Sequence, residues 1–144
     1  MKISETLEQP VTEPRGPEKL PHTILVAEYD RDLRKLLAAV LERRYTHVEF
    51  VDTSDQLLER LGSGNFDAVV AEKELPNISG AITKLRSPGS LNNVPVILLK
   101  LSRGTSEEEK VVMESNNTAL FLKPFDPKDL YTTIEKMIEE KKPE

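Results

Sequence analysis

The sequence contains no cysteine, fewer basic than acidic residues and no long hydrophobic run. Without thiols the chain can form no disulfide, no thiolate zinc site and no cysteine nucleophile, which is compatible with the cytoplasm. The 25 Asp and Glu residues outnumber 20 Lys and Arg residues, and the net charge of −5 disfavours nucleic-acid binding. No segment approaches the roughly 18 apolar residues of a membrane-spanning helix, and the N-terminus lacks a signal-peptide core. These absences predict a soluble cytoplasmic protein that binds neither membranes nor nucleic acids.

The remaining composition, 38% hydrophobic and 31% charged, is typical of a globular protein, and 144 residues suffice for one domain with its own core. Prolines interrupt the polar N-terminal segment at Pro10, Pro14, Pro17 and Pro21. Because proline donates no backbone hydrogen bond and little here can be buried, we predict an extended or disordered arm over residues 1–21. The domain then covers residues 22–141, with a tail over 142–144. An arm that binds a partner is the alternative.

Short apolar segments alternate with helical patterns through the rest of the sequence. The segments that predict strands cover residues 23–28, 47–51, 66–71, 94–99 and 119–122. The predicted helices follow the caps Asp30 and Thr53, cover about 79–86 and 105–115, and run from Pro127 to about residue 141. Five strands alternating with five helices predict an α/β protein whose parallel sheet is covered by helices on both faces.

In such a sheet the working crevice lies at the carboxyl ends of the strands. The polar residues that follow the predicted strands are Glu28, Tyr29, Asp30, Glu72, Lys100 and Lys123. These side chains are therefore the candidates for a functional site. The two histidines, His22 and His47, lie far apart in the pattern and form no metal-ligand or catalytic constellation.

Motifs at four of the strands resemble those of response-regulator receiver domains, from about Thr23 to Lys141. They read ILVAEYD at the first strand, FDAVVAEKELPNISG at the third, LNNVPVILL at the fourth and LFLKPF at the fifth. The resemblance implies a flavodoxin-like, doubly wound parallel sheet of five strands in the order 2-1-3-4-5 with five helices. It also implies a cis peptide bond before Pro124 and a role in two-component signal transduction.

The positions that carry phosphotransfer in the resembled family are altered here. The resemblance implies two acidic residues where Glu28 and Tyr29 stand, a phosphoacceptor Asp at Glu72, and a hydroxyl residue at Lys100. Only Lys123 and the proline after it match. Glu72 is one methylene longer than Asp, and a misplacement of about 1 Å can slow a reaction about 10²-fold. Tyr29 offers a phenol in place of a carboxylate, which makes it a poor ligand for Mg²⁺.

We therefore expect a degenerate phosphoacceptor pocket with no catalytic residue, no metal and no cofactor. Its residues are Glu28, Tyr29, Glu72, Lys100 and Lys123. Two glutamates facing two lysines would be neutral, with Glu72 held by lysine as a fixed structural charge. The alternatives are that the glutamates are only solvated, that Lys100 points out of the crevice, and that Tyr29 packs as an aromatic residue on the rim.

The resemblance also implies a partner surface on the fourth helix, fifth strand and fifth helix. On this chain the partner-binding candidates are Val111, Leu120 and Tyr131. Leu120 stands where the family has an aromatic residue that switches conformation. We therefore expect a surface that is displayed permanently rather than switched.

The leading hypothesis is a pseudo-receiver, a phosphorylation-independent module for protein–protein interaction and regulation that is not an enzyme. Its partner would be a signalling protein or an attached output domain. The alternative is an atypical Mg²⁺-dependent phosphoacceptor that uses another acidic residue near Glu72, such as Glu74 or Asp30. A flavin or nucleotide binder is disfavoured, because the turn AEYDRDL offers no Gly, Ser or Thr cradle for a phosphate.

Overall fold

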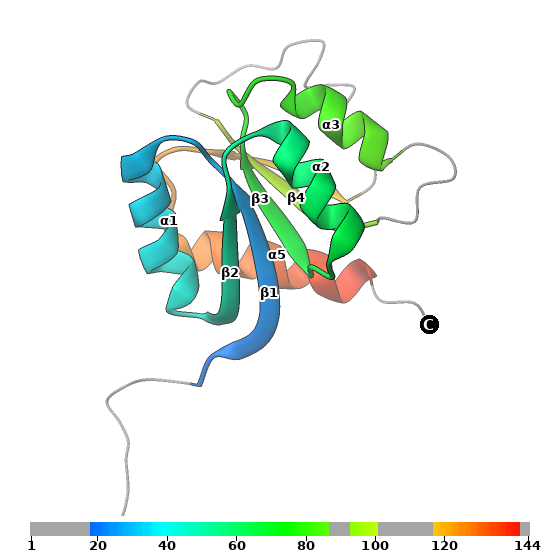
Figure 1. The fold of residues 1–144 in the computed structure, drawn as a ribbon. Coiled ribbons are helices and arrows are strands. Elements are labelled where there is room, and N and C mark those ends of the chain that lie inside the picture. Colours follow the sequence, from blue (N-terminus) through cyan, green and yellow to red (C-terminus); the bar gives the residue numbers. More distant parts are fainter. Residues whose placement is uncertain (1–17, 87–92, 101–116, 142–144) are drawn as a thin grey trace, which may run out of the picture.

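The computed structural model describes residues 18–86, 93–100 and 117–141 as an α/β fold (Figure 1). Its strands are β1 (Leu20–Ala27), β2 (Tyr45–Val51), β3 (Ala68–Glu72), β4 (Val96–Lys100) and β5 (Thr118–Leu122). Its helices are α1 (Arg31–Glu42), α2 (Ser54–Ser63), α3 (Ile78–Leu85) and α5 (Pro127–Lys141). The strands form one parallel sheet in the order β2-β1-β3-β4-β5, which confirms the expected fold class and strand order.

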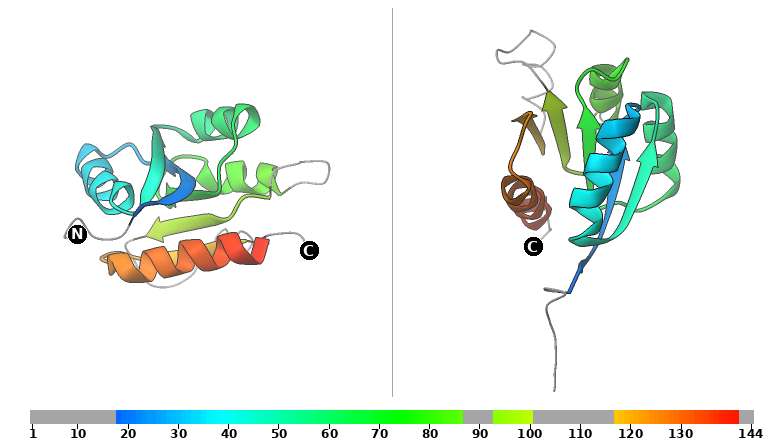
Figure 2. Two further views of the ribbon diagram at one scale, coloured as in Figure 1. Left: turned by 90° about the horizontal axis from the view of Figure 1, so that it is seen from below. Right: turned by 90° about the vertical axis from the view of Figure 1, so that its left-hand side faces the viewer.

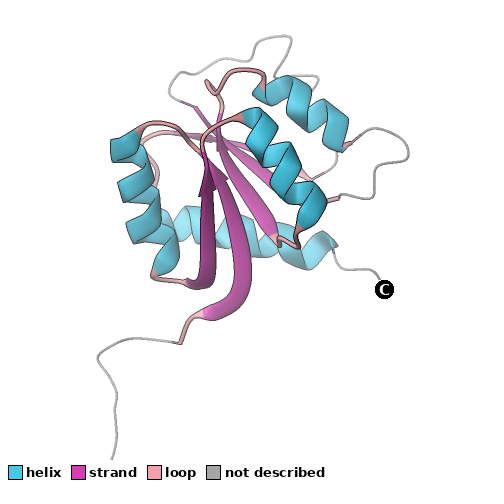
Figure 3. Ribbon diagram, viewed as in Figure 1, coloured by secondary structure: helices cyan, strands magenta, loops and turns pink. Residues whose placement is uncertain are grey.

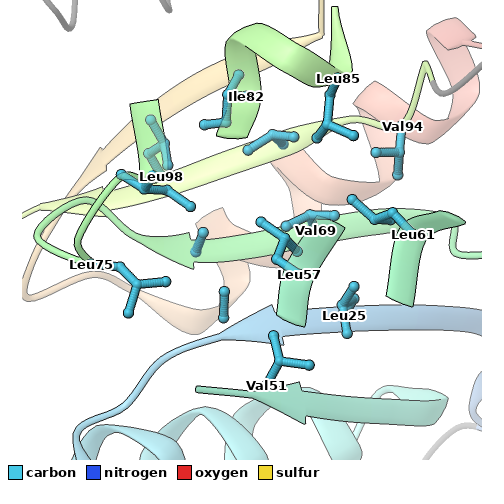
Figure 4. Close-up of a cluster of buried hydrophobic side chains, with 14 residues drawn as sticks. Leu25, Val51, Leu57, Leu61, Val69, Leu75, Ile82, Leu85, Val94 and Leu98 are labelled. Atoms are coloured by element: carbon cyan, nitrogen blue, oxygen red, sulfur yellow. The ribbon is translucent and has the colours of Figure 1, made fainter. Parts of the chain in front are cut away.

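Helices cover both faces of the sheet, because the central strands are apolar on both sides (Figures 2 and 3). Every residue of β3 and of β4 is buried. One face packs against α2 and α3, and Figure 4 shows Leu57, Leu61, Ile82 and Leu85 of these helices meeting the strand side chains. The opposite face packs against α1 and α5 in a second cluster that includes Leu37, Leu41, Leu130 and Ile134. Strand alternation thus divides the core into two layers.

The predicted caps begin the helices. The side chain of Asp30 accepts a hydrogen bond of 3.0 Å from the backbone N–H three residues later, and Thr53 does the same at 3.1 Å. Gln56 completes the start of α2, because its amide oxygen accepts from the backbone N–H just before Thr53 at 2.7 Å. Asp126 caps α5 in turn, with Pro127 as the first helical residue. These polar side chains satisfy N–H groups that a helix end leaves without an intrahelical partner.

Several element boundaries differ from the expected ones. β1 begins at Leu20, inside the range expected for the arm, because its backbone N–H bonds to Arg44 and a register shift before Thr23 accommodates Pro21. At the other ends, β3 and β4 each extend one residue further than expected, so that Glu72 and Lys100 are the last residues of their strands.

Two further expectations concern local geometry. The peptide bond between Lys123 and Pro124 is cis, as the resemblance implied. The third helix is short, eight residues, and it starts after Asn77 in the left-handed region at φ 64°. The expected fourth helix over 105–115 and most of the predicted arm lie outside the described residues. No helix among the described residues is long and apolar enough to cross a membrane.

One polar cluster ties the edge strand β2 to α5. Arg44 donates two hydrogen bonds to the carboxylate of Glu135, Nε at 2.7 Å and Nη2 at 2.8 Å. The fully buried Tyr45 donates its hydroxyl to the same carboxylate at 2.8 Å. The Arg44 guanidinium also lies 5.2 Å from the ring centroid of Tyr131 on α5. The hydrogen bonds from Arg44 lower the pKa of Glu135, whereas burial and the carboxylate raise the pKa of Tyr45.

This cluster predicts unequal effects of two substitutions on stability. Tyr45→Phe removes one hydrogen bond and should cost about 1 kcal/mol of unfolding free energy. Glu135→Ala also leaves the buried Tyr45 hydroxyl without an acceptor, so we expect a cost of about 2–3 kcal/mol. Urea unfolding of both variants and of the double variant measures these values. Glu139→Ala, on the exposed side of α5, is the control. Fully additive costs in the double variant would show that the Tyr45 hydroxyl is not held by Glu135.

Candidate functional site

Four charged residues stand where the parallel strands end, and these strand ends form the upper edge of the sheet in Figure 1. Glu28 follows β1, Glu72 ends β3, Lys100 ends β4 and Lys123 follows β5. Backbone hydrogen bonds extend the ladder to the first and last of these, from Glu28 N to Val51 O at 3.1 Å and from Lys123 N to Lys100 O at 2.8 Å. The sheet therefore fixes the backbone of each residue. Glu28, Glu72 and Lys100 are each at most 4% exposed.

The centre of the site is an ion pair between Glu72 and Lys123. The Lys123 ammonium donates a hydrogen bond to Oε1 of Glu72, and both side chains are less than 10% exposed. The other carboxylate oxygen of Glu72 accepts from the backbone N–H of Glu74 at 3.1 Å. Both oxygens of Glu72 are thus engaged within the protein. The contact between Lys123 and Glu72 agrees with the expectation that a lysine holds Glu72.

Glu28 lies beside this pair with only part of its carboxyl group satisfied. Its Oε2 accepts from the backbone N–H of Asp30 at 2.9 Å, in the turn that leads into α1. Its Oε1 is buried and has no hydrogen-bond partner in the described structure. Burial raises the pKa of the Glu28 carboxyl, and the nearby Glu72 carboxylate raises it further. The Asp30 N–H and the Lys123 ammonium act in the opposite direction without cancelling the rise in pKa.

Lys100 and Tyr29 occupy different surroundings at the strand ends. In β4, Val96 and Leu98 face the α2–α3 cluster, so strand alternation assigns Lys100 to that same side. Glu72 belongs by the same rule to the α1–α5 side. Tyr29 is 58% exposed, which fits the alternative that it lies on the rim.

The donor set of this site does not fit Mg²⁺. Octahedral coordination needs several free oxygen ligands at about 2.1 Å, and the phenol of Tyr29 cannot replace a carboxylate. Both oxygens of Glu72 are engaged, and one of those contacts is to a cation that would repel the metal. In the described part of the chain, no three His, Asp or Glu side chains are grouped in a way that could hold a metal ion. No step of chemistry is therefore assigned to a metal here.

The two expected partner residues that the structure describes, Leu120 and Tyr131, pack against opposite sides of the sheet. Leu120 is partly buried against the α2–α3 cluster. Tyr131 packs on the opposite side of the sheet, where its hydroxyl donates to the carbonyl of Val40 on α1. Val111 lies outside the described residues. Tyr131 thus serves the contact between α1 and α5, which its position in the sequence did not reveal.

A groove beside the site was not foreseen from the sequence. It has a volume of about 570 Å³ and is formed by the segments that follow β1, β2 and β3. Its lining consists of Tyr29, Arg31, Arg34, Asp52, Thr53, Leu75 and Pro76. The lining residues are separated by up to 47 positions in the sequence, from Tyr29 to Pro76, so no local motif marks them. Only the rule that loops at the carboxyl ends of strands gather together could have indicated it.

The family model of the response regulator receiver domain matches residues 24–135. Among curated proteins, the chain is similar to the phosphate regulon transcriptional regulatory protein PhoB of Escherichia coli (strain K12). The two are 27% identical over 113 residues, which cover 77% of this chain and 49% of PhoB. The chain thus spans about half the length of the curated relatives it matches.

Solved structures show the same fold. A putative response regulator from Chloroflexus aurantiacus matches with a TM-score of 0.71 at 21% identity, covering 83% of this chain and 99% of its own. The receiver domain of the sensor histidine kinase PA1611 from Pseudomonas aeruginosa, with magnesium in its active-site cleft, matches with a TM-score of 0.67 at 19% identity. That match covers 83% of this chain and 99% of the other. The family match, the strand order and the lysine at the end of β5 agree, and the chain belongs to the response regulator receiver domain family.

Proposed function

We propose that this receiver domain is a phosphorylation-independent module for protein–protein interaction in two-component signalling, and that it is not an enzyme. The observation that carries the proposal is the buried ion pair between Glu72 and Lys123. Glu72 occupies the position that the family resemblance assigns to the phosphoacceptor. Receiver domains interact with proteins such as kinases and output domains, so loss of phosphorylation leaves the interaction role intact.

Phosphorylation requires a carboxylate oxygen that is free to attack phosphorus in line with the leaving group. Oε1 of Glu72 accepts from the Lys123 ammonium, and Oε2 accepts from the Glu74 N–H. Attack would therefore require breaking a charge-assisted hydrogen bond in a buried setting. The donor set also lacks the carboxylates that would hold a divalent cation to neutralise the phosphoryl oxygens. Each of these features disfavours transfer to Glu72.

The atypical phosphoacceptor remains the second candidate, and the structure separates its two residues. The carboxylate of Asp30 is used to cap α1, with a hydrogen bond of 3.0 Å to the backbone N–H of Leu33. Glu74 is exposed, and only its backbone contacts the pocket, through Glu72. Glu74 is therefore the better of the two alternatives, because its side chain is accessible.

The first test is incubation with acetyl phosphate and Mg²⁺, followed by intact mass spectrometry. We expect no added phosphoryl mass on the parent, because both oxygens of Glu72 already accept hydrogen bonds and attack would disrupt the buried ion pair with Lys123. The same incubation of Glu74→Gln and Asp30→Asn variants identifies the acceptor if a phosphoryl group is found. A modification that disappears only in the Glu74→Gln variant would replace the proposed function by the phosphoacceptor alternative.

A second test asks whether the altered residues are what excludes the metal. About 10 mM Mg²⁺ should leave the melting temperature of the parent unchanged. The double variant Tyr29→Asp/Glu72→Asp restores two of the family's carboxylates and should be stabilised. A Kd ten-fold below the added concentration corresponds to about 1.4 kcal/mol. If Mg²⁺ changes the melting temperature of the parent and of the double variant equally, Tyr29 and Glu72 are not the residues that exclude the metal.

The raised pKa of Glu28 predicts a pH-dependent stability. Below the ordinary glutamate pKa, the protonated carboxyl contributes its full stability, which is lost as pH rises through the higher folded-state pKa. Glu28→Gln cannot ionise, so it should gain stability relative to the parent at about pH 8 and not at about pH 4. Thermal melts across this range measure the difference, with the exposed Glu42→Gln as control. A difference in stability between Glu28→Gln and the parent that is the same at all pH values would rule out a raised pKa of Glu28.

A further inference from the structure

The groove beside the ion pair lies where the strand order of the sheet reverses. Its lining residues follow β1, β2 and β3, and β1 lies between β2 and β3 in the sheet. In open α/β sheets this crevice is the usual place for a ligand, since the helices on either side diverge there. Its volume of about 570 Å³ is within the range of small-molecule sites. Size and position thus both suit a small ligand.

The charge on the groove favours an anion. Arg34 is already paired, because its Nη1 lies 2.6 Å from Oδ1 of Asp52 and its guanidinium lies 5.3 Å from the ring centroid of Phe50. Arg31 is exposed and forms no ion pair within the described residues. Arg31, Arg34 and Asp52 together leave one positive charge on the lining, in a protein whose net charge is −5.

The carboxylates of Asp30 and Asp52 keep their negative charges beside the lining, but each already has a partner. The carboxylate of Asp30 accepts from the Leu33 N–H and so caps α1. Asp52 is bound to Arg34. Arg31 is the first residue of α1, where the helix dipole adds to the positive potential. The Arg31 guanidinium is therefore the group on the lining that can receive a carboxylate without losing an existing partner.

The other part of the lining is apolar and aromatic. Tyr29 exposes 58% of its surface beside the groove, although large aromatic side chains are usually packed or at an interface. Leu75 and Pro76, from the segment after β3, contribute aliphatic surface. A ring or short hydrocarbon chain placed between Tyr29 and these residues would bury apolar area on both of its sides.

We propose that this groove binds an organic anion that consists of one carboxylate joined to a short aromatic or aliphatic body. The carboxylate pairs with Arg31, and the body packs between Tyr29 and the Leu75–Pro76 segment. This binding goes beyond the proposed function and does not depend on it. The same chemistry is offered by a free aryl acid and by an acidic residue next to an aromatic one in a partner peptide.

The experiment is a titration of the ¹⁵N-labelled full chain, followed by amide chemical shifts. The probe is 3-phenylpropionate, with 3-phenylpropylamine and acetate as matched compounds that reverse the charge or remove the ring. We expect saturable shifts at Tyr29, Thr53 and Leu75 with 3-phenylpropionate at millimolar concentrations. The amine and acetate should produce no saturable shift at the same concentrations, because each lacks one half of the recognised group.

Two variants with the same change in net charge test the role of Arg31. Arg31→Glu should weaken the binding of 3-phenylpropionate about ten-fold, since a partly exposed attraction becomes a repulsion. Arg43→Glu, exposed just after the same helix, should bind like the parent. Tyr29→Ala should also weaken binding while leaving the fold, because the Tyr29 side chain is mostly exposed. Unchanged affinity in the Arg31→Glu variant would overturn the proposal.

A last arm distinguishes the two sources of the anion. The acetylated and amidated dipeptide Phe-Glu carries the ring and carboxylate as a partner protein would present them. Tighter binding of the dipeptide than of 3-phenylpropionate assigns the groove to a peptide, and the reverse assigns it to a free acid. Equal binding of 3-phenylpropionate and 3-phenylpropylamine, or shifts that do not saturate for either anionic probe, would show that the groove does not select an anion.

Discussion

The buried ion pair between Lys123 and Glu72 is the interaction on which the rest of the site depends. Its members come from strands separated by β4 in the sheet, so the pair links the ends of β3 and β5. Removing one partner of such a pair leaves an uncompensated buried charge, at a cost of about 3–5 kcal/mol. A ligand that binds to either Glu72 or Lys123 must therefore also neutralise the buried charge of the residue that it leaves unpaired.

The formal charges of the four polar residues at the strand ends do not by themselves give the charge of the pocket. The sequence offers two glutamates and two lysines, which would sum to zero if all four met. Strand alternation assigns Lys100 to the other face of the sheet, and burial raises the pKa of Glu28. A pocket of Glu28, Glu72 and Lys123 moves toward neutrality as Glu28 takes up a proton. The raised pKa of Glu28 thus favours its neutral form beside the ion pair of Glu72 and Lys123.

The sequence predicted the features that local chemistry and periodicity determine, and it was silent on contacts between residues far apart in the sequence. Hydrophobic segments gave all five strands, and Asp30, Thr53 and Asp126 were correctly read as caps. The order of the strands came from the resemblance, because periodicity contains no information on which strands pair. Periodicity was silent on the neighbours of Tyr131, because its contacts with Val40, Tyr45 and Arg44 join residues about 90 positions apart in the sequence.

Tyr29 links the altered pocket to the neighbouring groove. It stands where the family resemblance implies a second carboxylate, and a phenol at this position removes a ligand that a divalent cation would need. The same side chain is exposed on the lining of the groove, where it supplies an aromatic wall beside Arg31. A carboxylate there would oppose the binding of an anion, because it would add a negative charge close to Arg31. Under the two proposals made above, the same Tyr29 side chain would disfavour metal-dependent phosphorylation and favour recognition of an anion.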